Sequence, residues 1–139
     1  MKKIIFLLIL LINISFANDI VGKLYEKIFT GIFPQKNSIL VYNIGNKKYN
    51  SKKIVYTKEI YNSDIIFISE FYRLGIYSNK PIFASSLIEL KLYENAIGAL
   101  YWDKDEPKII FLKDRLDKFN IKIANYLMDY IVDEKIHSF

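Results

Sequence analysis

Two short polar pairs, Ser69-Glu70 and Ser85-Ser86, directly follow runs of strand-forming residues in this chain. Hydroxyl and carboxylate groups at the ends of neighbouring parallel strands would share one crevice, which is where open α/β sheets bind ligands. The amides at the start of a helix predicted after Ser86 would offer donors to an anion. A plainer alternative stays open, in which Ser85 and Ser86 only cap that helix.

Catalytic chemistry has little support elsewhere in the sequence. The only histidine, His137, lies close to the C-terminus, where a frayed tail would not position a general base. There is no cysteine, which excludes thiol chemistry and disulfides. The densest acidic group, Asp103, Asp105 and Glu106, lacks the calcium-loop pattern and is expected to be a solvated turn. We therefore predict no catalytic residue, no metal site and no cofactor, and expect a protein that is not an enzyme.

Aromatic side chains suggest a second kind of site, one for a protein partner. Phe71, Tyr72 and Tyr77 surround a predicted short helix, and Tyr101 and Trp102 stand at the end of a predicted strand. Exposed aromatic residues at loop edges often anchor partner proteins, because one ring buries a large area. The alternative is that these rings fill the core.

The element that begins the mature chain is predicted to be an amphipathic helix. Asp19 can cap its first turn, and Pro34 ends it. Its apolar residues recur at helical spacing, which predicts packing on a sheet. These residues are Ile20, Leu24, Ile28 and Ile32, widened by Val21, Tyr25 and Phe29.

Strands are predicted wherever short apolar runs are bounded by turn residues. The run at 64–69 is apolar on both faces, which is typical of an interior parallel strand covered by helices. Between it and the next strand, residues 71–77 predict a short helix. Ser86 and Glu89 have capping-box spacing and open a helix to about Tyr93. The strands are predicted at 38–44, 53–57, 64–69 and 82–84.

The C-terminal third predicts a hairpin and a helix. Segments 96–101 and 108–113 are expected to pair antiparallel across a polar loop of about four to six residues. From Asp114 a helical region is predicted to about Asp133, with a break near Asn120. The fold class is therefore α/β: a single small Rossmann-like domain, with a mixed, mostly parallel sheet flanked by helices and a C-terminal hairpin and helix.

Residues 1–17 have the pattern of a cleavable signal peptide. Two lysines precede an apolar run, and Ser15 and Ala17 place small side chains where a peptidase requires them, ahead of a cut before Asn18. Removing Lys2 and Lys3 lowers the formal net charge from +5 to +3. We predict a periplasmic protein with one domain over 18–139. An uncleaved anchor stays open, although the apolar run is shorter than the ~20 residues that span a bilayer.

The order of segments resembles the YfiR-like periplasmic family. The similarity is carried by KLYEKIFTGIFP, SILVYNIG, KIVYT, NSDIIFIS, KPIFASS, NAIGALYW, KIIFLKDRL and IKIANYLMDYI, in that order. The resemblance implies an exported α/β protein that binds the periplasmic domain of an inner-membrane diguanylate cyclase and restrains it. Two departures are the missing cysteines and the stretch 45–53, which is too short for the helix usual there.

The function that follows is binding or regulation through an interface with a membrane or periplasmic protein. The alternative is a small solute-binding domain similar to one lobe of a transporter substrate-binding protein, which would need a partner or a homodimer to close around its ligand. The mild positive charge is spread over the chain, so no nucleic-acid partner is expected.

Overall fold

The computed structural model describes residues 19–70 and 78–135. Over these two ranges, every helix is too short or too polar to cross a bilayer. Several predicted features lie outside the described residues: the signal peptide, the short helix over 71–77 with Phe71, Tyr72 and Tyr77, and His137.

The described residues form one mixed, mostly parallel sheet of seven strands, in the order β2-β1-β3-β4-β5-β6-β7. Strands β1 to β5 run parallel to one another; β6 is antiparallel to β5, and β7 runs parallel to β6. This arrangement confirms the predicted fold class, a Rossmann-like α/β domain. The strands are β1 (Ile39–Ile44), β2 (Ile54–Thr57), β3 (Ile65–Ile68), β4 (Ile82–Ala84), β5 (Ala96–Asp103), β6 (Glu106–Leu112) and β7 (Ile131–Val132).

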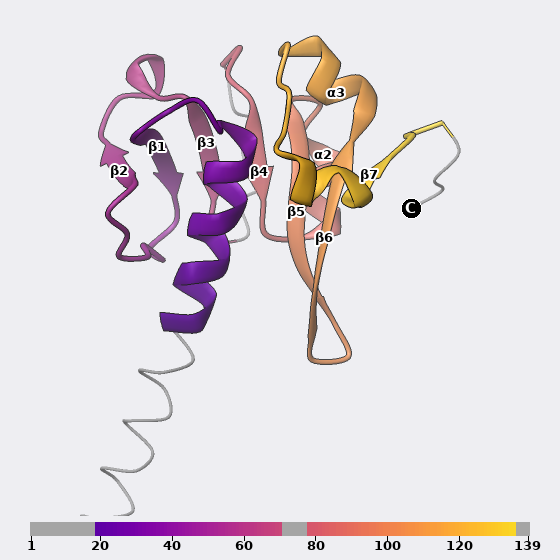
Figure 1. The fold of residues 1–139 in the computed structure, drawn as a ribbon, viewed down its shortest axis with the longest axis horizontal. Coiled ribbons are helices and arrows are strands. Elements are labelled where there is room, and N and C mark those ends of the chain that lie inside the picture. Colours follow the sequence, from indigo (N-terminus) through magenta and orange to yellow (C-terminus); the bar gives the residue numbers. More distant parts are fainter. Residues whose placement is uncertain (1–18, 71–77, 136–139) are drawn as a thin grey trace, which may run out of the picture.

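Helices cover both faces of this sheet. Residues 19–32, here called the N-terminal helix, lie in front of it, and α2 lies behind it (Figure 1). The N-terminal helix stops just before Pro34, as predicted, because proline has no amide to continue the helical ladder. The shorter helical elements are η1 (Ile60–Asn62), α2 (Leu87–Leu92), α3 (Lys113–Lys118) and η2 (Asn125–Tyr130).

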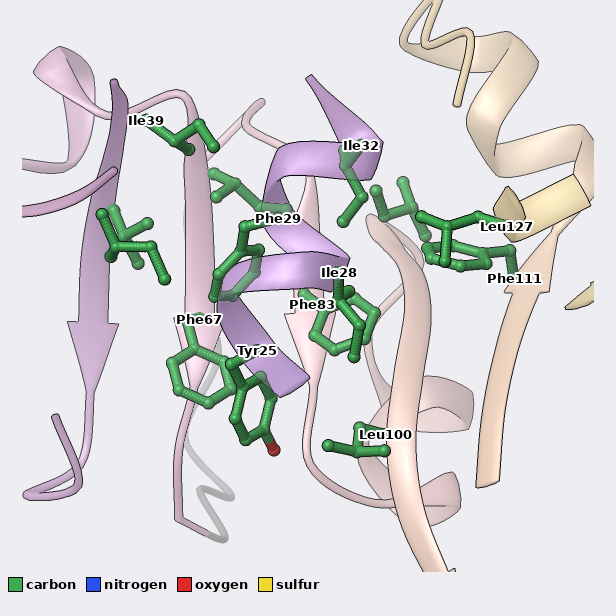
Figure 2. Packing of buried hydrophobic residues seen from close by; sticks show 14 of the residues in the cluster. Tyr25, Ile28, Phe29, Ile32, Ile39, Phe67, Phe83, Leu100, Phe111 and Leu127 are labelled. Carbon is green, nitrogen blue, oxygen red and sulfur yellow. The ribbon is translucent and has the colours of Figure 1, made fainter. Parts of the chain in front are cut away.

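The N-terminal helix packs onto the centre of the sheet through aromatic contacts. Figure 2 shows Tyr25 and Phe29 directed at Phe67 of β3 and Phe83 of β4. The ring centres of Tyr25 and Phe67 are 4.7 Å apart, and those of Phe29 and Phe83 are 5.6 Å apart. The predicted stripe was wrong at one end, because Ile20 is 66% exposed. The helix starts beyond the ends of β1 to β4 (Figure 1), so Ile20 projects past the sheet, while Val21 one residue on already packs against the core.

The opposite face of the sheet is covered mainly by α2. Leu90 of this helix packs against Ile66, Ile82 and Ala99, and all four are fully or almost fully buried. Strand β3 therefore contributes to both cores, since Ile66 and Phe67 point to opposite faces. That position explains why its sequence is apolar without alternation.

The β5–β6 hairpin differs from its prediction, because its loop has only two residues. Lys104 and Asp105 have φ values of 47° and 65°, as a tight hairpin turn with two left-handed residues requires. Glu106 and Pro107 belong to β6, where they pair with Asp103 and Trp102. The hairpin projects past the neighbouring strands into solvent (Figure 1), so its polar residues extend the strands instead of forming a loop.

The predicted break near Asn120 is confirmed, but the prediction of a helix beyond it was wrong, because that segment forms the short η2 and the strand β7. Helix α3 ends at Lys118, and Asn120 follows with a left-handed φ of 56°. The chain then returns toward the N-terminal helix, where the Ala124 amide donates to the Gly31 carbonyl at 2.7 Å. A continuous helix would carry Leu127 away from the core site that it fills beside Ile32 and Phe111 (Figure 2).

Candidate functional site

The strand order reverses direction between β1 and β3. Strand β2 lies on the outer side of β1, whereas β4 and β5 follow on the far side of β3. In doubly wound sheets such a reversal opens a crevice at the carboxyl ends of the two strands. Here those ends are Ile44 and Ile68, which pair with each other in the ladder.

At this point the chain segments approach so closely that only glycine fits after β1. Gly45 has a φ of 112°, and a Cβ placed on it would stand 2.6 Å from Ser69 Oγ and 3.0 Å from the Glu70 amide nitrogen. The amide and the hydroxyl of Ser69 both donate to the Ile44 carbonyl, at 2.9 and 3.2 Å. Ser69 and Glu70 are thereby fixed against the end of β1.

A hollow of about 290 Å³ opens at this edge of the sheet, and we call it the carboxyl-edge hollow. The ends of β3, β4 and β5 and the loop after β1 all contribute to it, together with the start of the N-terminal helix. Three of the four predicted ligand residues, Ser69, Glu70 and Ser85, come together there. The lining residues are Val21, Tyr25, Lys47, Tyr49, Ser69, Glu70, Ser85 and Trp102.

Ser86, the fourth predicted ligand residue, does not line the hollow. Its Oγ accepts a hydrogen bond from the Glu89 amide at 3.2 Å, which makes it the N-cap of α2. In return, Glu89 Oε2 accepts from both the amide and the hydroxyl of Ser85, each at 3.1 Å. Of the amides at the start of α2 that were predicted to face an anion, that of Glu89 is therefore already occupied by the Ser86 cap. The Ser85 amide, which precedes the cap, is occupied by the Glu89 carboxylate.

Glu89 is a feature of the site that the sequence did not reveal. The side chain is completely buried, and among the residues that the structure describes Oε1 has no hydrogen-bond partner. Capping-box spacing predicted a carboxylate that supports a helix start, but such carboxylates usually reach solvent. Only the packing of α2 under the sheet buries this one directly behind Ser85.

Tyr25 was predicted as a core residue, yet it also lines the hollow. Figure 2 shows its hydroxyl pointing away from the Phe29 ring. Burial raises the pKa of Tyr25 well above its ordinary value, and Tyr49 and the Glu89 carboxylate raise that pKa further. Tyr49 stacks on it at 4.9 Å between ring centres. Burial also raises the pKa of Tyr49. These phenols thus stay neutral beside the hollow in ordinary conditions.

The two predicted partner-binding residues within the described ranges behave differently. Trp102 is 55% exposed on the projecting hairpin and lines the hollow. Tyr101 is half-buried and packs against the apolar cluster beneath α2. Trp102 therefore remains a candidate anchor, whereas the ring of Tyr101 mainly completes the core.

A second hollow of about 570 Å³ adjoins the first and shares Lys47 and Tyr49 with it. Lys48 and Asn50 of the same loop and Gly22 of the N-terminal helix also line it. The loop is held in place by Tyr49, whose amide donates to the Tyr56 hydroxyl at 2.9 Å. Both hollows belong to one indented surface along the carboxyl edge.

Among residues 19–70 and 78–135, no three histidine, cysteine, aspartate or glutamate side chains are grouped closely enough to hold a metal ion. Comparisons of this chain with protein-family models, with curated proteins and with solved structures give no match. The carboxyl edge of the sheet is therefore the feature from which a function can be inferred.

Proposed function

We propose that this chain is an exported, non-enzymatic binding protein that regulates a partner protein through the carboxyl edge of its sheet. The observation that carries the proposal is Trp102, a mostly exposed indole on a projecting hairpin beside an indented surface. Tryptophan is strongly enriched among the residues that dominate binding energy at protein interfaces. Trp102 lies in the paired part of the hairpin, opposite Pro107, so its backbone is ordered before a partner binds.

The sequence features support a periplasmic setting for this activity. The signal-peptide pattern of residues 1–17 favours export, and the segment order resembles the YfiR-like family. On that resemblance, the partner would be an inner-membrane signalling protein such as a diguanylate cyclase, held in a restrained state by the bound domain.

Site-specific photocrosslinking in intact cells tests this proposal. A benzoylphenylalanine residue would replace Trp102 in one variant and Tyr61 in a control, because Tyr61 is 71% exposed on η1, next to the amino end of β3. We expect a discrete adduct with an envelope protein from position 102 only. No adduct, or the same adducts from both positions, would refute an interface at the carboxyl edge.

A second candidate function, solute binding, is favoured by the carboxyl-edge hollow. A hollow at the switch point of a parallel sheet, lined by converging polar groups, is the ordinary location of a small-molecule site. Thermal-shift screening separates the candidates. A solute that binds only the folded state raises the melting temperature, whereas a domain that binds only a protein shows no such stabilisation.

A further inference from the structure

We propose that the carboxyl-edge hollow binds a small solute through a primary ammonium group. The inference rests on the second candidate function, the solute site, and names the chemical class of its ligand. It is carried by the direction of the hydrogen bonds around the hollow and by a buried carboxylate behind it.

Each of the two serine hydroxyls in the hollow donates its single proton to a group of the protein itself. Ser69 Oγ donates to the Ile44 carbonyl at 3.2 Å, and Ser85 Oγ donates to Glu89 Oε2 at 3.1 Å. A hydroxyl has one proton and two lone pairs, so each serine can offer the hollow only an acceptor. The carboxylate of Glu70, on the same lining, is likewise an acceptor only. A ligand that satisfies these three groups must be rich in donors.

The charges around the hollow point to a cation. Glu70 lines it, and Glu89 lies behind Ser85 with one buried oxygen that lacks a partner among the described residues. Lys47 is the opposing charge on the lining. One lysine and two glutamates carry a formal charge of −1, and a buried carboxylate is costly unless positive charge or donors compensate it. Ser85 donates to the other oxygen, Oε2, so a ligand cation bound at Ser85 would compensate the charge of the carboxylate electrostatically and not by a hydrogen bond to Oε1.

Aromatic faces complete a setting suited to an ammonium group. Tyr25 and Tyr49 stack against each other at the wall, and Trp102 stands on the same lining. A cation within reach of such rings gains from their negative faces. The volume of about 290 Å³ suits a small solute. A primary ammonium group brings three donors and no acceptor, which matches the two serines and Glu70.

Titration followed by ¹⁵N NMR of the mature chain tests the inference, with ethylammonium chloride as the probe at low ionic strength. We expect saturable shifts of the Trp102 indole N–H and the Ser85 amide. Glu70→Gln should weaken the apparent affinity about tenfold, because it removes a charge-assisted contact. Glu94→Gln is the matched control, since Glu94 is exposed just before the amino end of β5, across the sheet from the hollow.

Two further probes decide between ligand classes. Tetramethylammonium has the same charge but no N–H donor, so shifts equal to those from ethylammonium would overturn the hydrogen-bond argument. If inorganic phosphate gave saturable shifts and ethylammonium gave none, the ligand would not be an ammonium compound. The hollow would still be a solute site. No shift from any probe would overturn the site itself, while the crosslinking result at Trp102 would still decide the protein interface independently.

Discussion

Gly31 lies directly against Leu127: a Cβ on Gly31 would stand 2.4 Å from Leu127 Cδ1 and 2.7 Å from the Tyr126 hydroxyl oxygen. The contact joins the N-terminal helix to η2, two elements far apart in the sequence. The Ala124 amide, which donates to the Gly31 carbonyl at 2.7 Å, fixes the same junction. The missing side chain at position 31 is thus what allows the C-terminal segment to close the core.

This junction predicts opposite effects for two glycine substitutions in one helix. Alanine normally stabilises a helix interior by up to about 1 kcal/mol relative to glycine. Gly22→Ala should show a gain of that size, because its nearest neighbour, Tyr49 Cβ, would be 3.4 Å away. Gly31→Ala should instead destabilise the domain by about 1–3 kcal/mol through overpacking against Leu127. Urea unfolding of both variants measures the difference, and a gain at position 31 would contradict the observed junction.

Arg115 ties together the C-terminal end of α2 and the start of β5. Its Nη1 donates to the carbonyls of Leu90, Tyr93 and Ala96 at 2.8, 2.7 and 3.0 Å, and its Nε donates to Glu134 Oε2 at 3.2 Å. The carbonyls at a helix end have no partner within the helix, so this guanidinium satisfies groups that would otherwise lack one.

Arg115→Met should therefore lower the free energy of unfolding by about 2–4 kcal/mol, since it strands partly buried carbonyls and one carboxylate. Lys113→Met is the control, because Lys113 is exposed on the same helix, and its effect should stay within about 0.5 kcal/mol. Chemical denaturation of the two variants gives the comparison. If both variants lost the same free energy of unfolding, the hydrogen bonds of Arg115 would contribute nothing to stability.

Ser86→Ala should separate the capping role from ligand binding. Losing the N-cap of α2 is expected to cost about 1 kcal/mol, whereas Ser38→Ala, at an exposed position, should cost far less. The shifts that ethylammonium induces at the Trp102 indole should be unchanged in Ser86→Ala, because Ser86 does not line the hollow. If Ser86→Ala lost ethylammonium binding but kept its stability, Ser86 would be a ligand residue and not the helix cap.

Stability should decline in strong alkali because of Tyr25. Burial, with the nearby Tyr49 and Glu89, raises the pKa of this phenol in the folded state. The folded state therefore holds the proton more tightly than the unfolded chain, whose tyrosines titrate near pH ~10. The stability linked to this group is fully present below that pH and is lost as the pH rises toward the folded-state pKa.

Urea midpoints at pH 8, 10 and 11 would measure this decline. Tyr25→Phe should make the curve between pH 10 and 11 less steep, because phenylalanine has no proton to lose, whereas Tyr49 and Tyr56, whose pKa values burial also raises, keep part of the slope. Tyr130→Phe, at an exposed ring, is the matched control and should keep the wild-type slope. An unchanged slope in Tyr25→Phe would show that other groups cause the alkaline loss.

Much of the sheet could be predicted, because most of its strands are short apolar runs that can be recognised from a few consecutive residues. The run 64–69 was identified as a central strand, and β3 is buried on both faces. The C-terminal helix was mispredicted because contacts with residues distant in sequence, such as Ala124 with Gly31, override the local pattern. The hairpin loop was mispredicted for a different reason: Asp103 pairs with Glu106 and Trp102 with Pro107, so polar residues that were expected to form the loop extend the strands.

The candidate site could be predicted only in part. Ser69, Glu70 and Ser85 were found because polar residues that end neighbouring parallel strands must meet at one edge. Lys47 and Tyr49 were not found, since a loop gives no periodic signal that places its side chains. Glu89 was predicted as the capping-box residue three positions after the Ser86 cap, but its burial depends on which face of α2 meets the sheet.

By itself, the sequence determined the fold class, the approximate positions of strands β1 to β6 and the N-cap of α2, all of which follow from periodicity and spacing within a few residues. It missed β7, because residues 131–132 were predicted to be helical. Only the tertiary structure decided the strand order, and with it the location of the switch point between β1 and β3. It also decided the direction of the hydrogen bonds around Ser69 and Ser85. The physical reason is that these properties depend on pairings between distant segments, whose free energies arise only when the sheet has assembled.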